Sequence, residues 1–513
     1  MKVLALFLSL VTLAHAAEPR WWKGNLHTHT LWSDGDDFPE MIADWYKRQG
    51  YHFLGLSDHN VIADKEHWVS LAKRKVKKAA LTKYKERFGD KWVELRDNKG
   101  DQEIRLKMLS EFRPALEEPD KFLMIPSEEI SGKFLKAPIH INATNIREKI
   151  EPQKGRSYVD VMQKTLEAVY AQRERLGVPM FPHINHPNFG WALTAEDLAQ
   201  VDRERFFEVY NGHPSVYNAG NKDRANTDRI WDIMLTKRLA ELGKDVVYGL
   251  GVDDSHAYHK GENQEVAVKL APKQEAEEKE KAEKAKLDEA KADEAEAKEA
   301  GVKEPAKKEA VAKDAPAKEP SPGDAAAKET EPKETAPGEA EKPEAHAKEK
   351  PAKDKKPAKP GRASEPGRGW VMVRAEKLDA ESLIAAMEAG DFYASSGVTL
   401  KEVVREKGRL AVEIVGEEGV TYTTEFFGTR KGYDGASEPV VDAKGVTLRT
   451  TRRYSKDVGA VLATVTGTSA SYELKGDEIY VRARITSSKA KANGSEDGEF
   501  ERAWTQPVVT GVK

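Results

Sequence analysis

Two periodicities alternate along residues 17–271, the two-residue period of strands and the 3.6-residue period of helices. Short apolar runs predict strands over 24–29, 52–56, 122–125, 137–141, 179–184, 206–210 and 246–252. Apolar residues at helical spacing predict helices over 39–49, 158–176 and 229–242, and residues 64–118 form a charged, helix-prone excursion. Strand and helix in alternation predict an α/β domain with a parallel sheet, either open or closed into a barrel.

The composition changes abruptly at residue 272. From there to residue 366 the chain is almost entirely Glu, Lys, Ala, Pro and Asp, without a single aromatic residue. Residues 273–300 could form a solvated helix through Glu–Lys pairs four residues apart. The proline-rich remainder is expected to be a disordered tether, with contact to a specific partner or to the cell wall as the alternative. A tether predicts that deleting 273–365 leaves a folded, active protein.

The segment 272–366 is interpreted as an insertion in one domain, because a further strand–helix pattern follows it. Residues 369–374 are strand-like, and a helix is predicted from Asp379, a candidate N-cap, to the residue before Gly390. We therefore assign 367–397 to the same α/β domain. From residue 398 to 513 the pattern changes to short alternating segments at 410–415, 446–451, 460–464 and 478–485, which predict a small β-sandwich domain.

The first sixteen residues are typical of a signal peptide. Lys2 precedes the apolar run 3–13, and Ala14-His15-Ala16 provides an A-x-A cleavage site. The alternative, a buried first strand or helix, is disfavoured because charged residues and a proline break the run at once. The run is too short to span a membrane, and no later stretch of about 18 apolar residues follows. The sequence therefore predicts an exported protein, periplasmic or secreted, without a membrane span.

Composition narrows the possible functions. The formal net charge of −4 argues against a nucleic-acid partner. The absence of cysteine excludes thiol nucleophiles and Cys-ligated zinc. The chain has neither a glycine-rich phosphate loop nor a G-x-S-x-G motif, so neither an NTPase nor a serine hydrolase is favoured.

Histidines and carboxylates recur in short runs at or beside the predicted strand ends. They are His27, His29, Asp34, Asp58, His59, Glu129, His140, His183, His186, Asp254 and His256. His27 and His29 are two apart on a predicted strand, which places both side chains on one face, about 7 Å apart. Active sites of barrels lie at strand ends, and a buried carboxylate is costly unless a cation compensates it. The pattern predicts a hydrolytic site with several divalent metals.

These runs resemble the PHP (polymerase and histidinol phosphatase) family. The motifs HxH (27–29), SDG (33–35), DHN (58–60), EIS (129–131), HI (140–141), HP (186–187) and DxH (254–256) occur in that family's order. The resemblance covers 21–270 and 369–397, and it implies a distorted (β/α)7 TIM-like barrel with two or three Zn, Mn or Fe ions. The runs 185–188 and 209–213 look closest to an exported branch that includes carbamate and aryl-ester hydrolases. The long charged insertion departs from the family pattern.

The resemblance also implies ligand sets. One ion would take His27, His29, Glu129 and Asp254. Glu129 would bridge to a second ion held by His140 and His186, and a third ion would take Asp34, His59 and His256.

Other assignments stay open at this point. Glu128 is an alternative to Glu129, which is preferred because it directly precedes Ile130 and Ser131, as in the family. His183 could orient a ligand, be a ligand, contact substrate, or simply pack. Glu208 and His213 end another predicted strand and could contact substrate or be structural. The aromatic residues Trp191 and Tyr217 could line a pocket or belong to the core.

The predicted activity is metal-dependent hydrolysis of a small-molecule phosphoester or ester by a metal-bridging hydroxide, with Asp254 or His256 moving the proton. A phosphoesterase ranks first because that is the family's commonest activity, and a carboxyl-ester, carbamate or amide hydrolase ranks second. Cationic side chains near the metals, from Lys133, Lys222 or Arg224, would favour a phosphate, whereas Trp and Phe would favour an aryl ester. The alternative from another class is a non-catalytic exported binding module.

Overall fold

The structure is a computed structural model that describes residues 18–74, 76, 78–259, 362–406 and 408–510. The predicted signal peptide and the predicted charged segment up to residue 361 lie outside the described residues.

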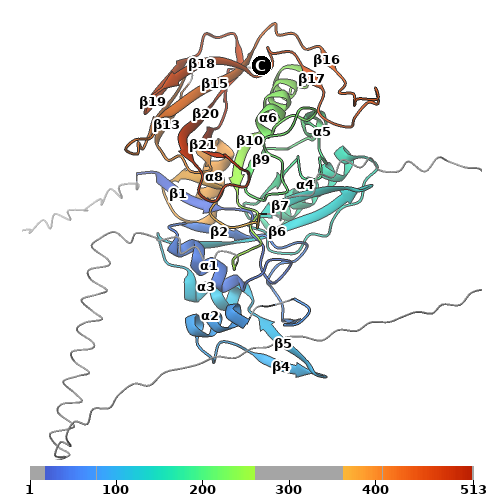
Figure 1. The fold of residues 1–513 in the computed structure, drawn as a ribbon, viewed down its shortest axis with the longest axis vertical. Coiled ribbons are helices and arrows are strands. Elements are labelled where there is room, and N and C mark those ends of the chain that lie inside the picture. The colour runs from blue at the N-terminus through green and yellow to red at the C-terminus, as the bar shows by residue number, and fades with distance from the viewer. Residues whose placement is uncertain (1–17, 75, 77, 260–361, 407, 511–513) are drawn as a thin grey trace, which may run out of the picture. The chain divides into compact units, whose positions relative to one another are not determined.

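A large mixed sheet organises the described residues, and helices accompany it in an α/β arrangement (Figure 1). Seven neighbouring strands of this sheet come from the first part of the chain, in the spatial order β10-β9-β8-β7-β6-β2-β1. Their bounds are β1 Arg20–Asn25, β2 Phe53–Leu56, β6 Leu123–Phe134, β7 Ala137–Thr144, β8 Phe181–Ile184, β9 Phe206–Asn211 and β10 Tyr248–Val252. The pairs β1–β2, β2–β6, β8–β9 and β9–β10 are parallel, as the alternation of strands and helices predicts.

Strand β7 departs from that prediction, because it runs antiparallel to both β6 and β8. Only residues 135 and 136 connect β6 to β7. A connection this short can join only antiparallel strands, since a parallel pair needs a crossover of a dozen or more residues. The prediction of a purely parallel sheet is therefore wrong at this strand.

The chain that follows β1 is held between two other strand ends. On one side, the Asp254 N–H donates to the His27 carbonyl at 2.9 Å, and the His29 N–H donates to the Ser255 carbonyl at 3.0 Å. On the other side, the Ser57 N–H donates to the Thr28 carbonyl at 2.9 Å. The segment 27–29 thus joins the residues after β2 to those after β10, the last strand of the seven.

Capping residues mark the ends of some of the helices. Their bounds are α1 Pro39–Arg48, α2 Lys78–Phe88, α3 Leu109–Leu116, α4 Tyr158–Leu176, α5 Ala195–Gln200, α6 Thr227–Thr236, the π-helical turn η1 Lys237–Glu241 and α8 Ala380–Ala389. Helix α4 has the predicted bounds. The Ser157 hydroxyl accepts from the Asp160 N–H at its start, and Gly177 takes a left-handed conformation (φ 63°) at its end.

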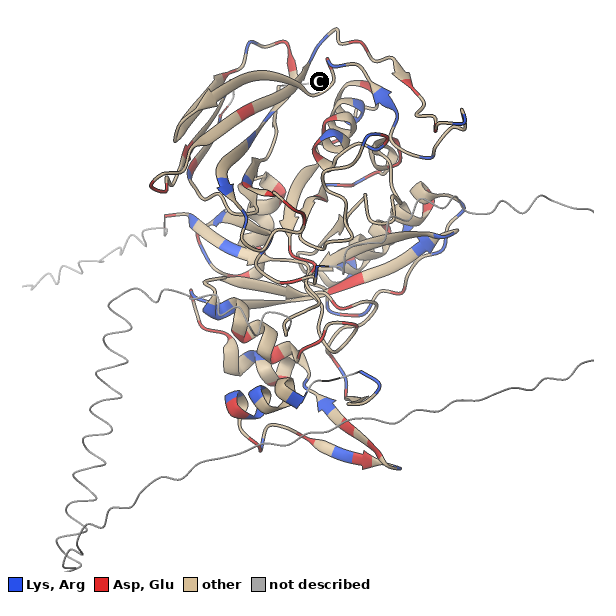
Figure 2. Cartoon of the chain, in the orientation of Figure 1, with Lys and Arg blue, Asp and Glu red and all other residues tan. Residues whose placement is uncertain are grey.

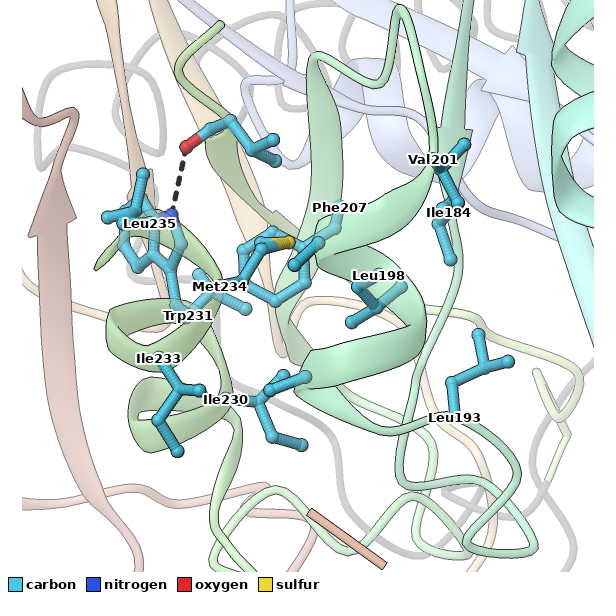
Figure 3. Packing of buried hydrophobic residues seen from close by; sticks show 14 of the residues in the cluster. Ile184, Leu193, Leu198, Val201, Phe207, Ile230, Trp231, Ile233, Met234 and Leu235 are labelled. Atoms are coloured by element: carbon cyan, nitrogen blue, oxygen red, sulfur yellow. Dashed lines mark hydrogen bonds between the residues drawn. The ribbon is translucent and has the colours of Figure 1, made fainter. Parts of the chain in front are cut away.

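A buried apolar core lies among α5, β9 and α6. Leu198, Phe207 and Met234, one from each element, belong to this core (Figure 3). The indole Nε1–H of Trp231 donates to the Val247 carbonyl at 2.9 Å, so the one polar atom of this buried ring is satisfied. The core fixes β8 and β9, whose carboxyl ends carry site residues.

The charge pattern of residues 64–118 predicted a helical excursion, but this segment is only partly helical. Three antiparallel strands, β3 His67–Ser70, β4 Leu95–Asn98 and β5 Asp101–Leu106, form a separate sheet. Every residue of β4 is exposed, so its sequence carries no apolar face to identify it. The turn at Lys99 and Gly100 has φ values of 56° and 85°, which is typical of a tight hairpin. Gly100 was therefore the signal in the sequence that could have indicated the hairpin.

The C-terminal residues extend the large sheet and add smaller ones. Strand β11 (Trp370–Ala375) pairs antiparallel with β1, and β12 (Phe392–Ser395), β21 (Phe500–Thr505), β20 (Glu478–Ala490), β15 (Tyr422–Arg430) and β18 (Ala460–Thr466) follow in that order. Strand β22 (Val508–Val509) pairs with β20. A separate sheet contains β13 (Leu400–Glu406), β14 (Arg409–Ile414) and β19 (Ser469–Glu473), and β16 (Ser437–Glu438) pairs with β17 (Arg453–Tyr454).

Two of these sheets share one apolar core. Leu410 and Val412 from β14 pack in the same buried cluster as Phe426 from β15 and Ile485 from β20. The strand predicted over 446–451 is absent, and Val446 is 58% exposed. Its alternating pattern therefore does not correspond to a buried face.

Charges of both signs are interspersed over the described elements (Figure 2). Among the helices that the structure describes, none is long and apolar enough to cross a membrane.

Candidate metal centre

The first two predicted ligands lie beyond their strand. Strand β1 ends at Asn25, so the prediction that His27 and His29 sit on a strand is wrong, and strand periodicity does not explain their geometry. The hydrogen bonds on both sides of 27–29 hold the segment instead. The two rings converge nonetheless, with their Nε2 atoms 3.1 Å apart.

All nine predicted metal ligands meet in one cluster. Four overlapping groups offer ligand atoms within 4.8 Å of one another: His29, Asp34, His59 and His256; His27, His186 and Asp254; His27, His29 and Glu129; and His59, Glu129 and His140. Six chain segments, remote in sequence, contribute to them. Most of these side chains are buried, and Asp34 is the exposed member.

Glu129 occupies the middle of the cluster. Its Oε1 lies 3.0 Å from His140 Nδ1, 3.3 Å from His186 Nε2 and 3.4 Å from His27 Nε2. Its Oε2 lies 2.6 Å from His59 Nδ1 and 3.6 Å from His29 Nε2. This carboxylate touches members of all three predicted ligand sets.

Glu128 faces away from the cluster. Successive residues of a strand point to opposite faces, and Glu128 Oε2 accepts from the Ile150 N–H at 2.9 Å. Of the two glutamates, Glu129 therefore lies in the cluster and Glu128 lies outside it.

Asp254 completes the cluster from the chain after β10. Its Oδ1 lies 3.3 Å from His27 Nε2 and 3.2 Å from His29 Nε2, and its Oδ2 lies 4.0 Å from His186 Nε2. Asp254 adopts φ 49°, a left-handed conformation that a non-glycine residue takes at a cost. The Asp254 N–H bond to His27 fixes this conformation.

The charges of the cluster depend on one another. Burial opposes ionisation of Glu129, but His140, His59 and His27 outweigh it and hold the pKa of the carboxyl well below its usual range. Burial likewise opposes the charging of His59, but the Glu129 carboxylate raises the pKa of His59 to about 9. Burial lowers the pKa of His29 to about 3, and His256 adds to that shift. In the protein alone, protons on some imidazoles balance the buried carboxylates.

The donor set fits divalent metal ions. Imidazole nitrogens with carboxylate oxygens are the ligands that Zn, Mn and Fe accept in proteins. Glu129 Oε2 is buried and lies 2.6 Å from His59 Nδ1. A buried carboxylate needs a compensating positive charge, which a protonated His59 supplies in the protein alone and which a bound cation would supply in its place.

Glu208 on β9 supports the cluster from behind. Its Oε1 accepts from His27 Nδ1 at 2.6 Å and lies 3.3 Å from His183 Nε2. Its Oε2 accepts from the His186 N–H and from Asn211 Nδ2, both at 2.8 Å. The bond to Nδ1 leaves Nε2 of His27 directed at the cluster, which is how carboxylates orient metal-binding histidines.

Two asparagines and an aspartate were not singled out by the sequence. Asn185 Nδ2 donates to Glu129 Oε1 at 2.8 Å, and Asn211 Nδ2 donates to Asp254 Oδ2 at 3.0 Å. Asp253 accepts from the backbone N–H groups of 367, 368 and 369 at 2.8, 2.6 and 2.7 Å. The sequence held a signal for Asn185, which stands inside the His183–Pro187 run. For Glu208, which the sequence analysis did name, the signal is a carboxylate in the middle of an otherwise apolar strand.

The last residues of the predicted insertion also reach the cluster. The His256 and Ala257 N–H groups both donate to the Ser364 carbonyl at 2.9 Å. The Ser364 hydroxyl donates to the Asp254 carbonyl. The loop that carries Asp254 and His256 is therefore fastened to the returning chain.

No protein-family model and no curated protein matches this chain. Among solved structures, it is similar to a two-domain protein from Bacteroides vulgatus described as containing a PHP-like metal-dependent phosphoesterase, with 13% identity, 95% of each chain covered and a TM-score of 0.34. It is also similar to a protein from Bifidobacterium adolescentis described as a metal-dependent phosphoesterase, with 11% identity, 47% of this chain and 89% of that chain covered, and a TM-score of 0.23. Likeness at these scores carries no conclusion about fold or activity.

Aromatic side chains lie beside the cluster. The ring of Phe189 is 5.0 Å from that of His186 and 6.1 Å from that of His213. Further along the same loop, Trp191 stacks on Tyr217 at 4.7 Å, and the Arg224 guanidinium lies 4.9 Å over the Trp191 ring. The other two cations weighed for phosphate binding are on the surface: Lys133 is exposed, and Lys222 pairs with Asp223 at 3.2 Å.

His213 faces the cluster without belonging to any of the ligand groups. Its ring is 5.3 Å from that of His256. Its Nδ1 accepts from the Ser215 N–H at 3.1 Å, so the neutral ring carries its proton on Nε2.

Proposed function

We propose that this protein is a metal-dependent hydrolase of the PHP type, and that a phosphoester is its substrate. The observation that carries the proposal is the convergence of nine histidine and carboxylate side chains around the buried carboxylate of Glu129. Two or three divalent ions (Zn, Mn or Fe) fit this donor set.

The ligand sets follow the contacts. His27, His29, Glu129 and Asp254 would hold one ion, and Glu129, His140 and His186 a second. Asp34, His59 and His256, with His29 beside them, would hold a third. Bound ions of this kind lower the pKa of coordinated water toward 7 and neutralise negative charge on the substrate.

The chain's own residues supply orientation and proton transfer. Glu208 and His183 are fully buried, so we assign them to positioning His27 and His186, in place of the substrate contact considered from the sequence. His256 Nδ1–H donates to the Asp254 carbonyl at 3.0 Å, which leaves Nε2 as the atom that would bind the third ion or, in a centre of two ions, take up a proton. His213 presents an Nε2–H toward the same space, and we propose that it donates to a substrate oxygen.

We also propose that the fold is a distorted barrel followed by a β-sandwich, and that the protein is exported. The bonds that join 27–29 to the chain after β10 support a distorted (β/α)7 barrel over 17–271, and the pairing of β11 with β1 supports 367–397 as its last strand–helix unit. The apolar core shared by two sheets supports a β-sandwich over 398–513. Export is tested by N-terminal sequencing of the protein recovered from a periplasmic fraction, which is expected to begin at Ala17.

A second candidate is an aryl-ester or carbamate hydrolase that uses the same centre. Phe189 packs against His140, at 6.2 Å, and His186, whereas Arg224 reaches the site only through its stack on Trp191. An aromatic wall beside the ligands suits a flat apolar leaving group.

The test combines metal analysis with a panel of chromogenic substrates: p-nitrophenyl phosphate, bis(p-nitrophenyl) phosphate and p-nitrophenyl acetate. We expect two to three equivalents of metal and hydrolysis of a phosphate ester, both lost in His186→Ala. His52→Ala, whose ring bonds only the Lys23 N–H outside the cluster, is the matched control and should retain both.

Each other outcome excludes part of the proposal. Hydrolysis of the acetate alone would favour the second candidate. Metal without any turnover would favour a non-catalytic binding module. A protein that binds no metal would refute both hydrolase assignments.

A further inference from the structure

A separate cavity lies on the face of β6 that points away from the metal centre. Its volume is about 260 Å³, and its lining includes Met124 and Pro126 of β6. These residues alternate with Glu129 along the strand, and Met124 packs with the apolar side chains of α1 and α3. The cavity therefore borders the face of β6 that carries Met124 and Pro126, and Asp58 at its wall directly precedes the cluster member His59.

The inner wall of this cavity is apolar. Ile62, Phe112 and Ile146 line it, and none of them is more than 8% exposed. Asp58, the carboxylate at this wall, accepts from the Thr30 N–H at 2.8 Å and from the Ser33 hydroxyl at 2.6 Å. Its bonding capacity is thus used within the protein, and the interior suits a hydrocarbon group.

The rim of the cavity is cationic. Arg113 and Arg147 both line it, with Asp64 as the one exposed carboxylate there. Arg147 donates only to carbonyl oxygens of Asn145 and Ile146 and to the Asn145 side chain. Within the described residues no carboxylate lies within ion-pair distance of Arg147, whereas Arg113 pairs with Glu117 at 3.0 Å.

The two guanidinium groups are close enough to repel each other. Partial burial and then the charge of Arg113 lower the pKa of Arg147. An anion at the rim would relieve this repulsion and would gain a charge-assisted hydrogen bond, bidentate if both nitrogens of the fork are used.

We propose that this cavity binds a small amphipathic carboxylate, with its hydrocarbon chain against Ile62, Phe112 and Ile146 and its carboxylate on Arg147. A cavity of about 260 Å³ is large enough for a chain of several carbons. The site needs no metal, so it stands independently of the hydrolase assignment.

The test is calorimetric titration of the full-length protein with octanoate, with octanol and acetate as comparison ligands. We expect octanoate to bind, and to bind more tightly than either comparison ligand. Arg147→Gln should weaken octanoate binding by about tenfold or more and leave octanol unchanged, because only the carboxylate uses the guanidinium. The control is Arg175→Gln, an exposed arginine that pairs with Glu148 next to Arg147.

A second variant fills the cavity. Ala63 lines it and is only partly buried, so Ala63→Trp should abolish binding of both octanoate and octanol. Absence of any octanoate binding would overturn the proposal. So would octanoate affinity that survives both substitutions, since that result would place the carboxylate elsewhere, for example on the metal centre.

Discussion

Glu128 and Glu129 show how one strand residue decides a role. They are adjacent in β6 and both are buried, yet Glu129 contacts five histidines and Glu128 contacts a backbone N–H. Glu129→Gln is expected to lower metal affinity more than tenfold, because it removes the carboxylate shared by the first two ligand sets. Glu128→Gln is expected to retain metal.

The measurement is metal content after dialysis against a graded series of chelator concentrations. Circular dichroism of both variants controls for folding. Equal metal retention in the two variants would show that Glu129 does not bind the ions.

In the proposed centre, Glu208 would orient the ligands without reaching the substrate. Removing its bond to His27 Nδ1 and its bond to the His186 N–H should lower metal affinity about 10- to 100-fold in Glu208→Ala. Activity at saturating metal should recover in large part, because the ligands themselves remain. A substrate-contacting residue would instead raise KM at every metal concentration, and that result would contradict the assignment. Activity titrated with metal separates the two.

The individual members of the cluster could be predicted from the sequence, but not the reason that they converge. Histidine and carboxylate runs at strand ends identified all nine members of the cluster. The identity of Glu208 and Asn185 as supporting residues depends on which atoms face which, and no residue pattern encodes that. His27 and His29 were assigned to a strand, but that strand ends before them. Hydrogen bonds from two distant segments hold residues 27–29 instead, and the sequence does not show these bonds.

The connection between α5 and β9 contains a buried carboxyl group that titrates. Burial raises the pKa of Glu204 to about 8, although Arg238 opposes the shift. In the unfolded chain this pKa is near 4.5, so the folded state binds more protons between those two values. The stability that Glu204 contributes is therefore fully present below about pH 4.5 and is lost as the pH rises toward 8.

Glu204→Gln should remove that dependence. Between about pH 5 and pH 8 the free energy of unfolding of the wild type should fall by about 1.4 kcal/mol per pH unit more than that of the variant. Urea unfolding in the presence of chelator measures both proteins without metal linkage. Asp202→Asn, at an exposed carboxylate two residues away, serves as control. Parallel pH profiles for Glu204→Gln and the wild type would refute the prediction.

Elements with strong local signals were predicted well. Helix α4 has the predicted bounds because Ser157 and Gly177 cap it, and α8 begins after Asp379, whose side chain accepts from the Ser382 N–H at 2.7 Å. The reversed direction of β7 was missed because the periodicity of a sequence does not indicate the direction in which a strand runs. In the sheet β3–β5, strand β4 is exposed along its whole length, and exposure erases the apolar alternation that identifies a strand, whereas β5 keeps that alternation with Ile104 and Leu106 buried.

At the scale of the whole molecule, the boundary of the insertion is tied to the metal centre. The predicted insertion ends at residue 366, yet Ser364 holds the loop of Asp254 and His256 through three hydrogen bonds. A deletion of 273–365 removes those bonds, so the expectation that this deletion is harmless needs revision. Asp253 accepts hydrogen bonds from the N–H groups of residues 367–369. The same deletion would remove the residues that precede this segment.

Two deletions that differ by a few residues test this coupling. Removal of 273–359 keeps Ser364 and should leave metal content and turnover within about twofold of the wild type. Removal of 273–365 should give a folded protein with metal affinity lowered about tenfold, because the backbone that carries two ligands loses its anchor. Ser364→Ala in the full chain, which deletes only the hydroxyl bond to the Asp254 carbonyl, should fall between them. If the longer deletion retains metal as well as the shorter one, then the loop of Asp254 and His256 keeps its position without the returning chain, and the anchor role of Ser364 is wrong.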